Sequence, residues 1–131
     1  MFFTRELQRR LDASNKNIKV NCFNPGLIVS TGLFRDQNPL FTKVFDFVAT
    51  DLFKVGETPH WGGGALEYMT LSDRVASKGG MYYTSPPGSS KYGDAAFGAQ
   101  FSESEVSFEA RDNAKGKQLW ELSEKLVGIS T

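Results

Sequence analysis

Cysteine and histidine are nearly missing from this sequence, which contains only Cys22 and His60 among 131 residues. A lone cysteine allows neither an intrachain disulfide nor a multi-cysteine metal site. Because Cys22 lies in an apolar run, it is predicted to be a small buried hydrophobe. With no cysteine or carboxylate at metal-ligand spacing, His60 is predicted to be a capping or surface residue, and no metal site is predicted.

A surplus of either charge is lacking as well, since 15 Lys and Arg residues balance 15 Asp and Glu. Nucleic-acid-binding domains normally carry a basic surplus, so that class is disfavoured. No run reaches the roughly 18 apolar residues of a membrane span. Aromatic residues are abundant, with 11 Phe, 4 Tyr and 2 Trp. They indicate either an aromatic-rich core or a large flat ligand.

One stretch organises the predicted fold, a strand over 18–23 and the turn behind it. Apolar and polar residues alternate from Ile18 to Phe23 with frequent β-branching, which predicts a strand. Asn24-Pro25-Gly26 ends it, because Pro lacks an N–H donor and Gly permits positive φ. Ligands of open α/β sheets bind beyond the carboxyl ends of strands. The turn and the apolar segment after it therefore predict a ligand floor and lid.

Helical patterns account for most of the remaining chain. Phe3, Leu7 and Leu11 recur at i, i+4 and i+8, which predicts a helix over 1–11. Thr58 followed by Pro59 is typical of a helix start. The predicted order is helix 1–11, strand 18–23, apolar helix 40–53, helix 59–69, strand 79–85 and helix 114–128. This order fits the end of a parallel α/β domain, with two adjacent strands in the sheet.

The predicted helix over 40–53 is apolar on nearly every side. A helix with so little polar surface is normally buried, so core packing is predicted for most of its residues. The alternative is an apolar lid over a large ligand. Lys43 and Lys54 are predicted to be surface residues.

Three consecutive glycines, Gly62-Gly63-Gly64, lie inside the predicted helix 59–69. No strand precedes them, and neither a Gly-x-Gly-x-x-Gly nor a Walker pattern is present. Because each interior glycine costs about 1 kcal/mol relative to alanine, close packing is the better explanation than a phosphate loop.

Two separated motifs resemble known enzymes. Asn24-Pro25-Gly26-Leu27-Ile28-Val29-Ser30-Thr31 resembles the Pro-Gly-x-Val/Ile-x-Thr segment of short-chain dehydrogenases/reductases, which lines the nicotinamide half of their cofactor site. Its continuation, Thr31-Gly32-Leu33-Phe34-Arg35 and then Pro39-Leu40-Phe41, is similar to the light-dependent protochlorophyllide reductase family. So is Leu119-Trp120-Glu121-Leu122-Ser123-Glu124-Lys125-Leu126-Val127-Gly128, which resembles the C-terminal helix of that family.

The resemblance implies that residues 1–131 are the C-terminal part of a doubly wound, parallel-sheet, Rossmann-like α/β domain. It implies NADPH as hydride donor and the light-driven reduction of protochlorophyllide to chlorophyllide in chlorophyll biosynthesis. It further implies a plastid location, with a cyanobacterial cytoplasm as the alternative. Peripheral plastid-membrane association and a homo-oligomer are compatible with it. No nucleic-acid partner is expected.

The resemblance also assigns site residues. Its predicted cofactor-binding residues are Pro25, Gly26, Ile28, Ser30 and Thr31, with Ile28 meeting the carboxamide through its backbone and Ser30 or Thr31 lying by a phosphate. Its predicted substrate-binding residues are Leu27, Leu33, Phe34, Arg35 and Phe41. Arg35 has two open roles, a substrate carboxylate or a structural salt bridge.

Two departures from the family pattern limit what the chain is expected to do alone. Leu27 stands where familiar members have a cysteine, so no thiol acts there. The Tyr-x-x-x-Lys pair and the Gly-rich phosphate loop are absent and are expected upstream of Met1. No catalytic residue is therefore assigned within the chain, which is predicted to be inactive alone and to aggregate or stay partly unfolded.

Two other hypotheses remain open. One is a short-chain reductase of another apolar substrate, such as a retinoid. The other is a non-catalytic pigment-binding or assembly protein, which the Leu27 departure leaves open. The Thr-Gly-Leu-Phe-Arg and Trp-Glu-x-Ser-Glu-Lys-Leu motifs favour the pigment reductase.

Overall fold

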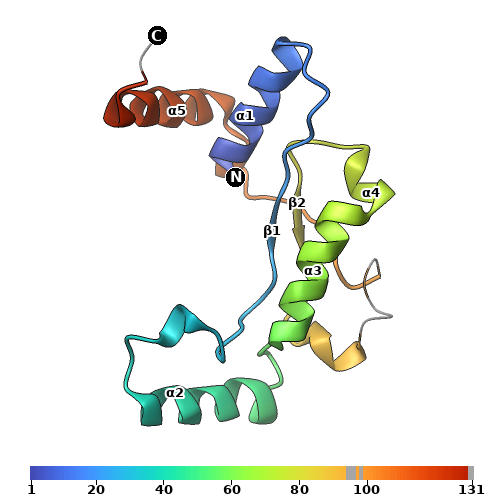
Figure 1. Cartoon of the computed structure of the whole chain (residues 1–131), viewed down its shortest axis with the longest axis vertical. Helices are drawn as coiled ribbons and strands as arrows, with labels where there is room; N and C mark the ends of the chain where they lie inside the picture. The colour runs from blue at the N-terminus through green and yellow to red at the C-terminus, as the bar shows by residue number, and fades with distance from the viewer. Residues whose placement is uncertain (94–96, 98, 130–131) are drawn as a thin grey trace. The chain divides into compact units, whose positions relative to one another are not determined.

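The computed structural model describes residues 1–93, 97 and 99–129 (Figure 1). Its helices are α1 (Phe2–Ala13), α2 (Pro39–Asp46), α3 (Pro59–Leu71), α4 (Asp73–Ala76) and α5 (Asn113–Val127). Its strands are β1 (Cys22–Asn24), β2 (Tyr82–Thr84) and β3 (Ser102–Glu103). Shorter turns of helix are η1 (Gly32–Phe34), η2 (Phe47–Leu52, a π-helix), η3 (Ser89–Tyr92) and η5 (Glu109–Arg111). The predicted elements occur in the predicted order, but α4 and β3 are additional and the predicted helix 40–53 is divided into α2 and η2.

The described chain is α/β, with a three-stranded mixed sheet in the order β1-β2-β3. Beside β1 and β2, the Gly80 N–H donates to the Val20 carbonyl at 2.7 Å and the Cys22 N–H to the Met81 carbonyl at 3.0 Å. This slanted register is that of a parallel pair. The expectation of a two-stranded sheet is wrong, because the Ser102–Glu103 strand is also present. It is two polar residues long, which is too short for a period-two signal.

The first strand is shorter than predicted, starting at Cys22 rather than at Ile18. The Gln8 side chain from α1 accepts the Val20 N–H at 2.7 Å and donates to the Ile18 carbonyl at 3.2 Å. A side chain thus takes backbone groups that a strand ladder would use. Cys22 is half-buried instead of fully buried, and its Sγ lies 2.9 Å from the Met1 Sδ.

The described residues form two compact units. The terminal unit comprises 1–22, 73–83 and 103–129, and the central unit comprises 23–72 and 84–102 as far as these are described. The predicted site lies in the central unit. No helix among the described residues is long and apolar enough to span a membrane.

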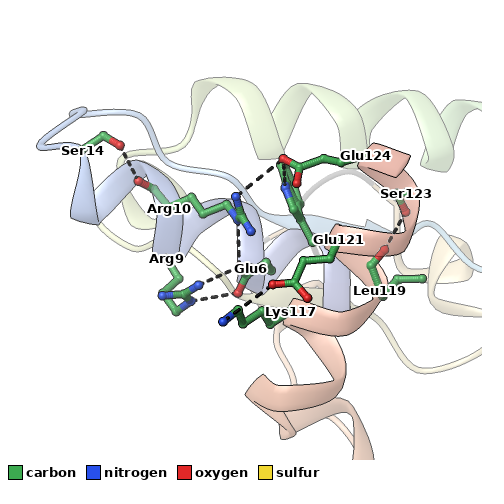
Figure 2. A network of polar contacts seen from close by, with 10 residues as sticks. Glu6, Arg9, Arg10, Ser14, Lys117, Leu119, Glu121, Ser123 and Glu124 are labelled. Carbon is green, nitrogen blue, oxygen red and sulfur yellow. Dashed lines mark hydrogen bonds and ion pairs between the residues drawn. The ribbon is translucent and has the colours of Figure 1, made fainter. Parts of the chain in front are cut away.

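The terminal unit is built on the packing of α1 against α5. The Phe3 and Trp120 rings stack at 4.6 Å between centroids, and the Arg10 guanidinium lies 4.7 Å from the Trp120 ring. Figure 2 shows Glu6 held by Arg9 and Arg10, with Glu124 of α5 reaching Arg10. The predicted apolar face of the first helix packs only in part, because Phe3 stacks on Trp120 but stays 47% exposed, whereas Glu6 and Gln8 are the buried residues of α1.

Glu6 makes the stability of the terminal unit depend on pH. Hydrogen bonding by Arg9, and secondly by Arg10, outweighs burial and lowers the pKa of Glu6 from 4.5 to about 2. A carboxyl with a depressed folded-state pKa contributes stability above its unfolded pKa of 4.5, and this is lost as the pH falls towards 2. Glu6→Gln is expected to flatten this acid limb of the unfolding free energy, measured by urea denaturation from neutral pH down to about pH 2.

The matched control for that measurement is Glu121→Gln in α5, which removes an exposed pair with Lys117 at 3.7 Å (Figure 2). Exposed pairs contribute little to stability, so this variant should keep the wild-type acid limb. An acid limb that Glu6→Gln leaves unchanged would contradict the assignment.

An aromatic cluster forms the core of the central unit. Trp61 and Phe101 are fully buried, and Trp61 stacks on Phe97 with 4.2 Å between centroids. Phe101 forms T-shaped pairs with Tyr68, at 5.8 Å between centroids, and with Phe23, at 6.0 Å. An aromatic-rich core, one of the two explanations for the aromatic content, is thus present.

The start of α3 is confirmed, with Pro59 in its first turn and the Thr58 hydroxyl accepting the Trp61 N–H at 3.1 Å. A Cβ on Gly62 would lie 2.5 Å from Ile28 Cδ1, and one on Gly64 would lie 2.6 Å from Phe97 Cε2. Close packing therefore explains these two glycines, as predicted. Gly63 has no described neighbour within 4 Å of its Cβ position and stays unexplained.

The prediction that the apolar segment 40–53 packs in the core is wrong. Six of its large apolar side chains are more than half exposed: Leu40, Phe41, Val44, Phe47, Leu52 and Phe53. Only Ala49 in η2 is buried. An apolar pattern reports that a partner is needed but does not say that the partner is in the same chain. Lys43 and Lys54 are exposed, as predicted.

Candidate functional site

The turn after β1 has the backbone chemistry that its sequence predicts. The Asn24 Oδ1 accepts the Gly26 N–H at 3.0 Å, which is an Asx turn. Gly26 has φ +91, in the region that favours glycine. A Cβ at Gly26 would also lie 2.5 Å from Glu57 Cγ. Gly26 is therefore required both by its backbone angle and by a close neighbour.

Beyond the turn, the chain runs along the segment that leads into α3. Leu27 forms a parallel bridge with Gly56, and its carbonyl accepts the Glu57 N–H at 2.7 Å. The Ile28 side chain reaches the Gly62 position, and its carbonyl accepts the Thr31 hydroxyl at 2.9 Å. Through these contacts, Leu27 and Ile28 connect the turn to the start of α3.

A hollow of about 380 Å³ opens where the chain passes from Val29 into α2. Its lining is Val29, Ser30, Thr31, Phe34, Arg35, Gln37, Pro39, Thr42, Lys43 and Asp46. Four predicted site residues are thus brought together: Ser30, Thr31, Phe34 and Arg35.

The other predicted residues do not line this hollow. Pro25, Gly26, Leu27 and Ile28 lie at the turn and beside the start of α3. Phe41 is more than half exposed on α2 and stacks on Phe45 at 5.8 Å. The side chain of Leu33 lies outside the described residues.

Three polar lining residues on α2 were missed as site candidates, namely Thr42, Lys43 and Asp46. Thr42 and Lys43 lie three and four residues after Pro39, and Asp46 lies four and three residues after them, which places the set on one helical face. That spacing is the signal that could have found them. This spacing is hard to recognise because most of the remaining positions of the segment are apolar.

The polar groups of the hollow suit an anion. Ser30 and Thr31 are exposed and carry hydroxyl groups. Arg35 and Lys43 add two exposed cations, and among the described residues Arg35 makes only a loose ion pair, with Asp36 at 3.8 Å. Asp46 accepts the Thr50 hydroxyl at 3.1 Å. The Thr31 hydroxyl already donates to the Ile28 carbonyl, so the Ser30 hydroxyl with Arg35 and Lys43 supplies the groups that fit the phosphate of a nucleotide.

Next to this hollow, α2 presents an aromatic surface. Phe45 contacts Phe34 at 5.7 Å and Phe41 at 5.8 Å between ring centroids. Phe47 and Phe53 of the same apolar segment are exposed. A π-helix such as η2 is uncommon and is frequently found at functional sites. Together these rings suit a flat apolar ligand.

A larger hollow, of about 600 Å³, lies along α3. Its lining is His60, Gly63, Gly64, Glu67, Tyr68, Leu71, Ser72 and Phe97. None of these is a predicted site residue, and no Lys or Arg is among them. With Glu67 as its carboxylate, this hollow is less suited to a phosphate. His60 itself is exposed in the first turn of α3, in agreement with a surface role.

The part of the chain that the structure describes contains no set of metal ligands. No three His, Cys, Asp or Glu side chains gather there in a way that could hold an ion.

Comparison with known proteins agrees with the motifs. The chain is 35% identical over 106 residues (81% of this chain, 24% of the relative) to protochlorophyllide reductase B, chloroplastic, of Oryza sativa subsp. japonica. It is 33% identical over 129 residues (98% and 26%) to protochlorophyllide reductase, chloroplastic, of Marchantia paleacea. It is also 34% identical over 131 residues (98% and 33%) to retinol dehydrogenase 14 of Homo sapiens.

The chain therefore spans about a quarter to a third of the length of these relatives. No protein-family profile matches it.

Proposed function

We propose that this chain, which is related to the protochlorophyllide reductases, forms part of an enzyme that reduces protochlorophyllide to chlorophyllide with NADPH and light. Within that enzyme it would be the C-terminal portion of a doubly wound, Rossmann-like domain. The relatives from rice and Marchantia are named chloroplastic, and we extend that location to this protein.

The observation that carries the proposal is the hollow after β1. It is lined by hydroxyl groups, two cations and Phe34, and the segment that follows exposes Phe41, Phe47 and Phe53. A reductase of a large pigment needs both the polar groups and the aromatic rings, because a phosphate held near this turn fixes the nicotinamide that donates the hydride, and the flat ring system of the substrate must lie against that nicotinamide.

The roles of the residues depend on this placement. Ser30 and Thr31 would hold the phosphate next to the nicotinamide, and the backbone of Ile28 would meet the carboxamide. Leu27, Leu33, Phe34 and Phe41 would border the pigment. When bound, NADPH supplies the hydride. Neither the Tyr-x-x-x-Lys pair nor a Gly-rich phosphate loop occurs in this chain, so residues outside it would orient the proton donor and the remaining phosphates.

Arg35 is the residue that would distinguish the pigment from a neutral substrate. Its guanidinium is largely exposed at the hollow, and its nearest described carboxylate, on Asp36, lies 3.8 Å away. An arginine in this state is available for a carboxylate side chain of the pigment.

A second function is favoured by the similarity to retinol dehydrogenase 14, which matches as well as the plant enzymes do. The protein would then reduce a retinoid or another long apolar carbonyl compound at the same site. Neither retinal nor retinol carries a carboxylate, so Arg35 and Lys43 would have no substrate group to bind. A pigment-binding protein without catalysis is the third possibility, and Leu27 in place of the family cysteine is compatible with it.

The test is binding of protochlorophyllide and of all-trans-retinal to the 131-residue chain, monitored by quenching of intrinsic fluorescence. We expect tighter binding of the pigment, and about tenfold weaker pigment binding in Arg35→Gln, since an exposed charge-assisted contact contributes about 1.4 kcal/mol. Lys19→Gln, which changes an exposed cation of the terminal unit, is the control and should bind like wild type.

Three results would contradict the proposal in different ways. Preferential binding of retinal would favour the retinoid reductase. Pigment binding that NADPH does not strengthen would favour a non-catalytic binding protein. Formation of chlorophyllide by the chain alone, with NADPH and light, would show that it is not merely one part of the catalytic site.

A further inference from the structure

We propose that Glu57 is the positioning residue of this site, because its buried carboxylate fastens the Asn24–Ile28 turn to the loop after β2. The contacts by which Glu57 joins the two segments are observed in the structure. Their consequence for ligand binding rests on the proposed function.

The carboxylate of Glu57 is bound on both oxygens. Its Oε1 accepts the Ser89 N–H and its Oε2 accepts the Ser90 N–H, each at 2.8 Å. Ser89 and Ser90 begin the turn η3, directly after Gly88. The residue is 3% exposed. Glu57 takes part in none of the ion pairs between described residues. Among the described residues, two backbone N–H groups therefore stabilise the Glu57 carboxylate. Removing these donors would leave a buried charge unpaired, which is energetically costly.

The other end of Glu57 holds the turn. Its N–H donates to the Leu27 carbonyl at 2.7 Å, and its Cγ lies 2.5 Å from where a Cβ of Gly26 would be. One residue thus contacts the turn through its backbone and side-chain stem, and the loop after β2 through its carboxylate. These three segments are far apart in sequence but belong to the same compact unit.

Glu57 matters for the site because its contacts lie next to the lining of the hollow. Val29 is buried, and Ser30 and Thr31 enter the hollow directly after it. The backbone of Ile28 therefore lies between a contact of Glu57, at Leu27, and the lining of the hollow. If the Glu57 carboxylate loses Ser89 or Ser90, the segment whose Glu57 N–H holds the Leu27 carbonyl is less fixed, and the Ile28 backbone then shifts relative to Ser30 and Thr31. A displacement of that kind changes selectivity at the carboxamide more than it changes overall binding.

The experiment compares Glu57→Gln with wild type and with Glu67→Gln, a control on an exposed residue of α3. Glutamine keeps the size of glutamate but has one acceptor oxygen, so one of the two N–H groups loses its acceptor. Hydrogen exchange of the full chain is the first readout. We expect exchange at 26–28 and 89–90 to quicken about tenfold in Glu57→Gln, with the terminal unit unchanged.

The second readout is selectivity, which general destabilisation would not alter. NMR titrations with reduced nicotinamide mononucleotide and with the reduced mononucleotide of nicotinic acid compare a carboxamide with a carboxylate on otherwise equal probes. Wild type and Glu67→Gln are expected to prefer the carboxamide, and Glu57→Gln to lose most of that preference. Glu57→Asp keeps both acceptor oxygens and should recover part of it.

Equal exchange in Glu57→Gln and wild type would overturn the fastening. Unchanged selectivity in a Glu57→Gln protein that exchanges faster would overturn the positioning role, as would a Glu57→Asp variant no better than Glu57→Gln. If wild type binds neither probe, the proposed cofactor site is contradicted. The hydrogen-exchange data would still decide whether Glu57 fastens the turn.

Discussion

Replacing Gly88 with alanine is expected to lower the free energy of unfolding by about 3 kcal/mol or more. Gly88 has φ +73, and a Cβ there would lie 1.8 Å from the Lys54 carbonyl oxygen. The obstructing atom belongs to the backbone, so no side-chain rotation relieves the clash. The loop after β2 would have to move away from the segment 54–55, and Ser89 and Ser90 would move with it.

Gly128 offers a matched control for this substitution. Its backbone angles, φ 72 and ψ 23, are almost those of Gly88, at φ 73 and ψ 23. No described atom lies within 4 Å of its Cβ position. Gly128→Ala therefore meets only the left-handed backbone penalty, about 1 kcal/mol. The difference between the two variants isolates the steric clash with Lys54.

Urea denaturation of both variants measures that difference. Gly88 lies in the central unit and Gly128 in the terminal unit, so unfolding is followed by far-UV circular dichroism, which reports on the helices of both units. Equal destabilisation by Gly88→Ala and Gly128→Ala would mean that the approach of Lys54 to Gly88 does not exist in solution.

Trp61→Ala is expected to cost about 3 to 5 kcal/mol of unfolding free energy, the usual range for a fully buried tryptophan. The side chain is 1% exposed and stacks on Phe97 at 4.2 Å. Removing the indole leaves a large cavity beside α3. The aromatic cluster that contains Phe97 and Phe101 then loses its largest side chain. The α1–α5 pair lies in the other unit, which confines the direct loss of contacts to the central unit.

Trp61→Phe is the informative companion to that variant. The indole N–H of Trp61 is buried without an acceptor among the described residues, which is already unfavourable in the wild type. Phenylalanine removes this unsatisfied donor and keeps a ring against Phe97, so it should cost less than half as much as alanine. Equal losses for the two substitutions, measured by chemical denaturation, would contradict this description of the core.

Local sequence signals predicted the elements well where the interactions are local. Thr58 and Pro59 mark the start of α3 because an N-cap acts within one turn of helix. Asn24 and Gly26 form the predicted turn for the same reason, since the hydrogen bond spans two residues. Gly128 has the left-handed conformation that commonly ends a helix.

Where the prediction was wrong, a distant residue is the cause. The Gln8 side chain accepts the Val20 N–H and so delays the start of the first strand. The third strand, Ser102–Glu103, adds to the sheet with no pattern of its own. Phe47 and Phe53 are exposed although the apolar pattern predicted their burial. The pattern carries no information about which chain supplies the packing partner.

For the candidate site, the motif pointed to the turn but not to its surroundings. Ser30, Thr31, Phe34 and Arg35 are contiguous enough to be recognised together, and the structure collects them at one hollow. Lys43 and Asp46 join them only because α2 folds back along the same opening. Glu57 could not be found in advance, since its role depends on two N–H groups more than 30 residues away.

The sequence by itself determined the order of the longer helices and of the first two strands, the caps of α3 and the turn after β1, and the similarity to protochlorophyllide reductases. These depend on contacts within a few residues or on motifs read along the chain. Only the tertiary structure decided that the apolar segment 40–53 is exposed and that Glu57 joins the Pro-Gly turn to the loop after β2. Burial and long-range hydrogen bonds depend on which segments meet in space, and a one-dimensional pattern does not record that.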